Sequence, residues 1–354
     1  MTNKTFVKIQ AYELFTPKFL GDSFAMERYD HEQIEYLLQR ICNIPLKQRA
    51  FHIGKSGEYK VINLVDIRHS EDQDFMEGAF SCARYGQLEE IINVHEQIKT
   101  GEKPRDHGLK NEVPFILDKR NGLLLLHKDK NNVVSREMIY KYFRYHINEI
   151  DLYCEEFNSV NPTAKIFKRS FVKVGAVPSQ DFFEEIKNFA LIKEAFVIKN
   201  IENIDQINNE GIAFLTREAT ENNVEDFQEM KVSYKNTVKK RGIKHITAFF
   251  EKLYEADKYD KYGVSGQLES GKPKTITMAK FPQTYDIKVS INENGIISLS
   301  DLINEMIAIA KYQNPVIDKN EGVQPIEKVG DLLNAKEKQK GSEDEASEPG
   351  KEIS

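Results

Sequence analysis

The sequence is poor in cysteine, with only Cys42, Cys82 and Cys154 among 354 residues. These cysteines are far apart, odd in number and without further cysteines or histidines at ligand spacing, so neither a disulfide framework nor a zinc site is indicated. Disulfides belong to oxidising compartments, and their absence favours a reducing cytoplasm. We therefore expect a cytoplasmic protein that carries no structural metal and no cofactor.

Long apolar runs are also missing. No stretch approaches the roughly 18 consecutive apolar residues that a membrane-spanning helix requires. Met1 is followed by Thr-Asn-Lys and then by alternating apolar and polar residues, which differs from the apolar core of a secretory signal peptide. Together these two absences predict a soluble protein without a targeting segment.

A strong excess of one charge is absent from most of the chain. The formal net charge is −6, and residues 318–354 hold ten acids against six lysines, which leaves a charge of only −2 for the rest. Residues 318–354 are rich in Lys, Glu, Ser and Gly, and such a segment cannot bury enough apolar surface to offset the entropy of an ordered chain. We expect a disordered tail there and a nearly neutral folded body.

The strongest local pattern is an apolar pair of segments, Val113–Leu117 and Leu123–Leu126, around the turn Asp118–Gly122. Asn-Gly in this turn tolerates positive φ, so the pattern predicts a buried β-hairpin. Ser135 then suits the N-cap of a helix that packs one face on the hairpin. The residues of that face are Ile139, Tyr142, Phe143 and His146.

The length of the chain favours two domains, because single cores stop growing near about 250–300 residues. We predict an α+β protein with two mixed domains, largely antiparallel sheets and the disordered tail. Residues 1–157 form a mixed antiparallel sheet with two main helices. The expected elements are strands at Thr5–Phe15, Arg49–Ile53, Tyr59–Ile67 and Ala79–Tyr85, a helix after Asp30, and a long surface loop over Glu96–Asn111.

Residues 158–317 are expected to form an α/β sandwich. Its first part reads as a β-α-β unit: strand Lys165–Val174, helix Ser179–Phe189 and strand Lys193–Lys199. The remaining expected elements are strands Ile212–Thr216, Met230–Tyr234 and Tyr285–Ile291, helices Thr237–Tyr254 and Ser300–Tyr312, and a glycine-rich turn region over Tyr262–Lys272.

Two short patterns carry chemistry. Gly266–Lys272 has the spacing of a phosphate-binding loop, but Pro273 replaces the metal-binding hydroxyl and a strand follows, so a turn is the better interpretation. Glu269, Asp286 and Lys288 are the residue types with which some nucleases hold a metal ion and position water, and alternation puts Asp286 and Lys288 on one side of a strand. A solvated strand face is the commoner reason for such a pair.

Charge segregation is the most informative pattern. There is no acid between Glu156 and Asp181 and none between Glu229 and Glu251. Two cationic clusters in one domain can build a positive face, which gains free energy on a polyanion by releasing counterions, although each cluster can equally be a solvated face. The candidate nucleic-acid-binding residues are Lys165, Lys168, Arg169 and Lys173 in the first cluster and Lys235, Lys239, Lys240, Arg241 and Lys244 in the second.

The order of elements across residues 1–315 resembles the cytoplasmic component of the Rex phage-exclusion system and related prophage proteins. The similarity lies in the apolar strand pair with its Ser-capped helix, and in the later series that ends with the basic helix, a strand, an Asn-Gly turn and a last helix. A longer linker at Asn209–Glu229 and the acidic tail depart from the pattern. The resemblance implies a dimer-forming, DNA-binding defence protein with a separate membrane-protein partner.

From these observations the first hypothesis is a non-catalytic phage-defence protein, of the exclusion or abortive-infection type, that binds DNA without strong sequence preference. The second is a metal-dependent nuclease that uses Glu269, Asp286 and Lys288. The third is a prophage accessory protein that contacts no nucleic acid.

Overall fold

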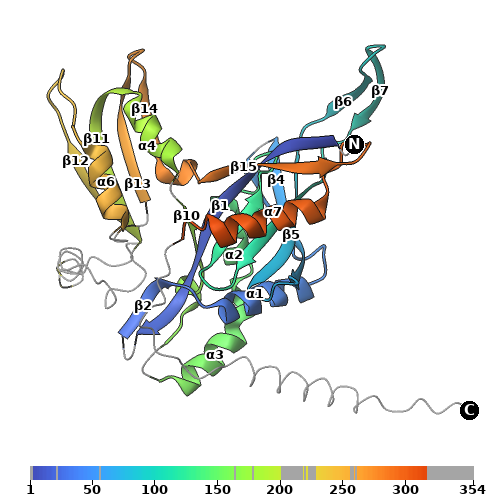
Figure 1. Cartoon of the computed structure of the whole chain (residues 1–354), viewed down its shortest axis with the longest axis horizontal. Helices are drawn as coiled ribbons and strands as arrows, with labels where there is room; N and C mark the ends of the chain where they lie inside the picture. Colours follow the sequence, from blue (N-terminus) through green and yellow to red (C-terminus); the bar gives the residue numbers. More distant parts are fainter. Residues whose placement is uncertain are drawn as a thin grey trace, which may run out of the picture.

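The structure, a computed structural model, describes residues 3–20, 23–55, 57–162, 165–177, 179–200, 229–255 and 261–316, and also residues 218, 221 and 259. Helices and antiparallel sheets make up these ranges, so the expected α+β class is confirmed. The strands form a large sheet, a four-stranded sheet and a separate two-stranded hairpin (Figure 1).

The large sheet is organised around β1 (Asn3–Leu20), which is 18 residues long. One edge of β1 pairs with β9 (Leu123–His127). The opposite edge is shared by two strands. β15 (Thr284–Ile291), from late in the chain, pairs with the first half of β1, and β10 (Lys173–Ala176), from the middle of the chain, pairs with its middle. The last residues of β1 pair with β2 (Ser23–Arg28).

Beyond β9 the sheet continues through β8 (Asn111–Asp118), β5 (Phe75–Tyr85), β4 (Glu58–His69) and β3 (Phe51–Lys55), which forms the outer edge. Residues along β8 alternate between two cores, because Phe115 and its period-two neighbours enter one core and Ile116 enters the other. Both faces of this strand are therefore covered, which explains its continuous apolar sequence.

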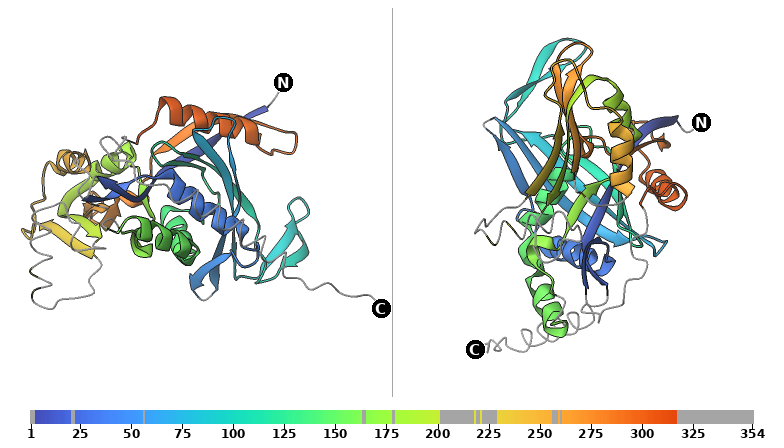
Figure 2. Two further views of the ribbon diagram at one scale, coloured as in Figure 1. Left: turned by 90° about the horizontal axis from the view of Figure 1, so that it is seen from below. Right: turned by 90° about the vertical axis from the view of Figure 1, so that its left-hand side faces the viewer.

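Helices cover the large sheet on both faces (Figure 2). On one face lie α1 (His31–Asn43), α2 (Arg136–Tyr145) and α3 (Asp151–Val160), with the short 3₁₀ helix Ile147–Ile150 joining the last two. On the other face lies α7 (Leu299–Tyr312). The caps predicted at Asp30 and Ser135 are confirmed, since the side chain of Asp30 accepts from Glu32 N and that of Ser135 accepts from Met138 N. Ser179, which precedes the helix Gln180–Lys187, makes no such side-chain bond within the described residues.

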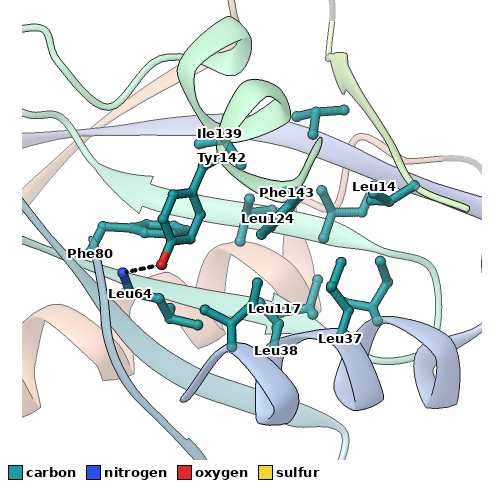
Figure 3. Packing of buried hydrophobic residues seen from close by; sticks show 14 of the residues in the cluster. Leu14, Leu37, Leu38, Leu64, Phe80, Leu117, Leu124, Ile139, Tyr142 and Phe143 are labelled. Atoms are coloured by element: carbon teal, nitrogen blue, oxygen red, sulfur yellow. Dashed lines mark hydrogen bonds between the residues drawn. The ribbon is translucent and has the colours of Figure 1, made fainter. Parts of the chain in front are cut away.

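The predicted hairpin and its helix form the centre of the larger core. Gly122 closes the β8–β9 turn with φ +80°, as the Asn-Gly pattern requires. The aromatic face of α2 packs on the sheet, and the Tyr142 hydroxyl accepts a hydrogen bond of 2.9 Å from Leu64 N inside the core (Figure 3). This bond supplies a partner for a buried strand N–H, so the helix is fixed to β4 by a polar contact as well as by packing.

The second sheet has the order β12 (Glu229–Lys235), β11 (Phe189–Asn200), β13 (Lys261–Leu268) and β14 (Pro273–Thr277). Two helices share its core: α4 (Gln180–Lys187) and α6 (Ile246–Glu255). Most of the expected glycine-rich turn region is thus strand β13. Gly266 lies within that strand, where an added Cβ would stand 2.1 Å from the carbonyl oxygen of Leu191, so close strand approach explains this glycine.

Sheet membership differs from the expected β-α-β unit. Lys165–Val174 is not an alternating strand, because it contains the 3₁₀ helix Lys168–Ser170 and only the start of β10. Strands β10 and β11 lie in different sheets, and β15 and α7 also join the large sheet. The physical reason is the second edge of β1, whose hydrogen-bond partners come from β10 and β15, both far along the chain from β1. The short 3₁₀ helix Met278–Lys280 precedes the return to β15.

Two further expectations were wrong. Residues expected in a surface loop form part of a hairpin of β6 (Glu89–Asn93) and β7 (Ile98–Lys103). Three lysine–glutamate ion pairs lie on this hairpin. Its sequence is too polar to show the alternation by which a strand is predicted. The expected helix Thr237–Tyr254 begins only at Ile246. The expected strand Ile212–Thr216 and the tail 318–354 lie outside the described residues.

We expect Tyr142→Phe to lower the free energy of unfolding by about 1–3 kcal/mol, because it leaves the N–H of Leu64 buried without a partner. Urea denaturation followed by circular dichroism measures this difference. Tyr145→Phe is the matched control, since Tyr145 is 54% exposed and lies on the same helix. An equal loss in both variants would contradict the assigned role of the buried bond.

A second prediction concerns pH. Burial acts to raise the pKa of Asp129, but the N–H groups of Asn131, Val133 and Val134 and the amide of Asn111 bind its carboxylate and lower that pKa below its ordinary value. The ionised carboxylate therefore stabilises the fold above the unfolded pKa of about 3.9, and this contribution disappears as pH falls towards the folded pKa.

The stability advantage of the wild type over Asp129→Asn should then be about 1–3 kcal/mol at neutral pH and shrink below about pH 4. Thermal or urea unfolding at a series of pH values checks this. A difference between the two proteins that stays constant from pH 7 to pH 3 would be inconsistent with the lowered pKa.

Candidate nucleic-acid interface

The second predicted cationic cluster lies mainly in the segment Asn236–His245, which connects β12 to α6 and which we call the basic loop. The side chains of Lys239, Lys240, Arg241 and Lys244 in this loop are all exposed. None of these four cations forms an ion pair with a carboxylate in the part of the chain that the structure describes. The loop therefore presents its charge to solvent.

The backbone of the basic loop is held by one ammonium group. Lys193 Nζ, from β11, donates to the carbonyl oxygens of Val238 (2.6 Å), Lys239 (3.2 Å) and Arg241 (2.7 Å). An ammonium group that donates hydrogen bonds to three carbonyl oxygens of one loop restrains the backbone conformation of that loop. The exposed lysines and the arginine therefore lie on an ordered backbone.

Further bonds tie both ends of the basic loop to β11. Asn236 N donates to the carbonyl of Lys193 at 2.9 Å, and Ile243 N donates to the carbonyl of Ile192 at 2.9 Å. Between them, an added Cβ on Gly242 would stand 3.2 Å from Ile192 N, so the loop runs close against the strand. These contacts use the backbone groups that a helix over this segment would need, and the helix starts after them.

Lys235 is placed differently from the loop cations, because it lies on β12 and shares a carboxylate. Glu194 stands 2.7 Å from Lys231 Nζ and 3.7 Å from Lys235 Nζ, and the hydrogen bond from Lys231 is the main cause of the lowered pKa of Glu194. Tyr234, between these two lysines in sequence, is 57% exposed and packs edge-on against Phe249. An exposed aromatic ring is therefore present on the strand that leads into the basic loop.

The first predicted cationic cluster is not brought to the same place. Lys165, Lys168 and Arg169 lie between α3 and the edge strand β10 of the large sheet, and Lys173 is the first residue of β10. Lys168 Nζ is engaged by Asp151 at 2.5 Å and by Asn148 Oδ1 at 3.1 Å, and Arg169 and Lys173 also have partners. The two clusters thus belong to different sheets, and in the first cluster at least three of the four cations already have partners.

The nuclease constellation is also not assembled. Asp286 and Lys288 are exposed on the same face of β15, as the alternation predicts, but Asp286 pairs with Lys8 at 3.6 Å. Glu269 lies in the turn between β13 and β14, in the other sheet. Within the described ranges, no group of three or more His, Cys, Asp or Glu side chains could hold a metal ion.

The histidines and cysteines occupy separate structural positions. His146 is buried with its Nε2 3.0 Å from the carbonyl oxygen of Arg49, and burial is the main cause of its lowered pKa. Cys42, Cys82 and Cys154 are all free, and burial raises the pKa of the last two to about 12. At neutral pH these two thiols stay protonated and are poor nucleophiles.

Lys193 is the interface residue that the sequence did not reveal. It lies on a predicted strand and reads there as one more solvated lysine, because nothing in its local pattern shows that three carbonyls will converge on it. Lys193 reaches these carbonyls because β12 pairs with β11 and places the basic loop next to it.

No family model matches this chain, and no curated protein is significantly similar to it. In the portion of the chain that the structure describes, no helix has both the length and the apolar composition needed to cross a membrane.

We expect Lys193→Met to accelerate hydrogen exchange of the backbone amides in the basic loop by about tenfold, because the ammonium group that restrains local opening through three carbonyls is removed. Mass spectrometry of peptides covering residues 236–245 measures this rate. Lys187→Met is the control, since among the described residues that lysine pairs with Glu184 on its own exposed helix turn and with no other carboxylate. Unchanged exchange in the Lys193 variant would show that the loop is held by its other bonds.

Proposed function

We propose that this protein binds nucleic acid without strong sequence preference through the basic loop. The observation that carries the proposal is the combination of four exposed cations, Lys239, Lys240, Arg241 and Lys244, which have no ion-pair partner among the described residues, with a backbone fixed by Lys193. Lysine and arginine that neutralise phosphates release condensed counterions, and this release is the main source of sequence-independent affinity.

The chemistry of the loop favours phosphate contact over base reading. Its side chains are chiefly point charges, and the side chain of Asn236 is occupied within the loop, where its Oδ1 accepts from Val238 N at 3.0 Å. Phosphate contacts position a protein on nucleic acid without carrying sequence information. The exposed ring of Tyr234 on the adjoining strand adds a surface on which an unpaired base can stack.

The wider biological role is part of the same proposal and rests on the resemblance to the Rex exclusion system. On that basis the protein acts in the cytoplasm in phage defence, as a homodimer that works with a separate membrane protein. The nuclease alternative receives no support from the positions of Glu269 and Asp286 in different sheets. The non-binding accessory role predicts that the basic loop contacts no polyanion, and the following measurement separates the two.

We expect the triple variant Lys239→Glu, Lys240→Glu, Lys244→Glu to bind duplex DNA about tenfold or more weakly at low salt, and equally so for unrelated sequences. The slope of log K against log salt should become shallower, by up to about 0.9 for each phosphate that the variant no longer neutralises. Fluorescence anisotropy over a salt series measures both quantities. Folding should change little, because exposed charges contribute roughly 0–1 kcal/mol each.

The matched control is Lys47→Glu, Lys128→Glu, Lys130→Glu, which makes the same change in net charge at three exposed lysines of the large-sheet region. This control should keep most of the affinity, since only the long-range field changes. If the two triple variants bind equally well with equal salt slopes, the basic loop is not the interface.

A further inference from the structure

A pocket of about 420 Å³ opens at the end of the large sheet farthest from β1, where β3, β4 and β5 meet the first turns of α2. We call it the end pocket. Lys60 and Arg84 from the strands, Ser135 and Met138 at the start of the helix, and Ile53 and Tyr59 contribute to its lining. A volume of this size lies within the range that small-molecule sites occupy, roughly 300–1,000 Å³.

Two like charges lie opposite each other in the end pocket. Lys60 on β4 and Arg84 on β5 are direct cross-strand partners. Like charges at such positions destabilise a sheet. Neither side chain has a carboxylate within ion-pair distance in the described part of the chain, and the closest polar contact of Lys60 Nζ is the carbonyl oxygen of Asn132 at 3.5 Å. An anion between the two cations would convert their repulsion into attraction.

The carboxylates that line the end pocket are partly engaged by other lysines. Glu137 is engaged by Lys141 at 2.6 Å, and Glu89 is engaged by Lys103 at 3.0 Å. Glu58 also lines the pocket and forms no ion pair among the described residues. With these lysines counted, Lys60, Arg84, Lys103 and Lys141 face Glu58, Glu89 and Glu137, so the local charge is positive. The positive end of the α2 helix dipole, at Ser135, adds to it.

The apolar wall beside the two cations comes from Ile53, the cross-strand partner of Lys60, and from Met138 of α2. Tyr59 and Tyr85 are also cross-strand partners, and their rings stack with centroids 5.3 Å apart and planes inclined by 26°. Because successive residues of a strand point to opposite faces, this aromatic pair lies on the face of β4 and β5 opposite to Lys60 and Arg84.

We propose that the end pocket binds a small phosphorylated ligand with an apolar or planar body, of which a nucleoside monophosphate is the example. The phosphate lies between Lys60 and Arg84, and the body of the ligand packs against the apolar side chains of Ile53 and Met138. Arginine and lysine are the usual phosphate partners, and charge-assisted bonds to phosphate are about twice as strong as neutral ones. This site is separate from the basic loop and does not depend on it.

The test is isothermal titration calorimetry of the full chain with adenosine 5′-monophosphate, and with adenosine as the probe that lacks the phosphate. We expect the nucleotide to bind about tenfold or more tightly than the nucleoside, and Lys60→Gln, Arg84→Gln to remove that difference. Glu58→Gln should tighten nucleotide binding a few-fold, a gain that mere structural damage would not produce.

Three control measurements accompany this test. The control Lys128→Gln, Lys130→Gln removes the same charge from exposed positions outside the pocket lining and should bind the nucleotide as the wild type does. The basic-loop triple variant should also bind it normally, and the Lys60 and Arg84 double variant should keep its affinity for duplex DNA. No heat of binding with the nucleotide, or equal affinity in the double variant and the wild type when both melt at the same temperature, would overturn the assignment.

Discussion

The large sheet depends on the hydrogen bonding of β1. A strand of 18 residues exposes rows of N–H and C=O groups on two edges, and both rows need partners when the strand lies in the middle of a sheet. The central hairpin supplies one row through β9, and β15 and β10 supply much of the other. Because β15 comes from late in the chain and is followed by α7, the same constraint brings α7 onto the second face and closes the core around Ile9 and Ala11.

Sequence patterns were sufficient where a local rule decided the outcome. The Asn-Gly turn, the caps at Asp30 and Ser135 and the period of the apolar residues in α1, α2 and α7 all depend on neighbours within a few positions. Sheet membership depends instead on pairing across more than a hundred residues, and β10 and β15 carry no local mark of the strand they join. A one-dimensional pattern gives the type of an element but not its partner.

The basic loop shows the same limit for the candidate interface. Its positive charge is visible in the sequence. The helix expected from Thr237 is wrong before Ile246, because the apolar spacing of α6 does not continue as a helix through Gly242. No sequence pattern marks the cations of the end pocket, because Lys60 and Arg84 are far apart in sequence and become neighbours only through the register of β4 and β5. Surface ion pairs contribute little to stability. A paired cation therefore says little about function, whereas an ordered cation without a carboxylate partner indicates a candidate site for an anion.

The route of the chain between the two sheets has a consequence for how the molecule is made. The chain leaves the large sheet after β10 and returns at β15, and Gln283 N donates to the carbonyl of Val177 at 2.9 Å, so departure and return lie side by side. The second sheet is thus an insertion whose two ends meet. During synthesis, the insertion emerges from the ribosome complete while β1 still lacks β15. The smaller unit can fold first, and the larger one must wait for the last part of its own sequence.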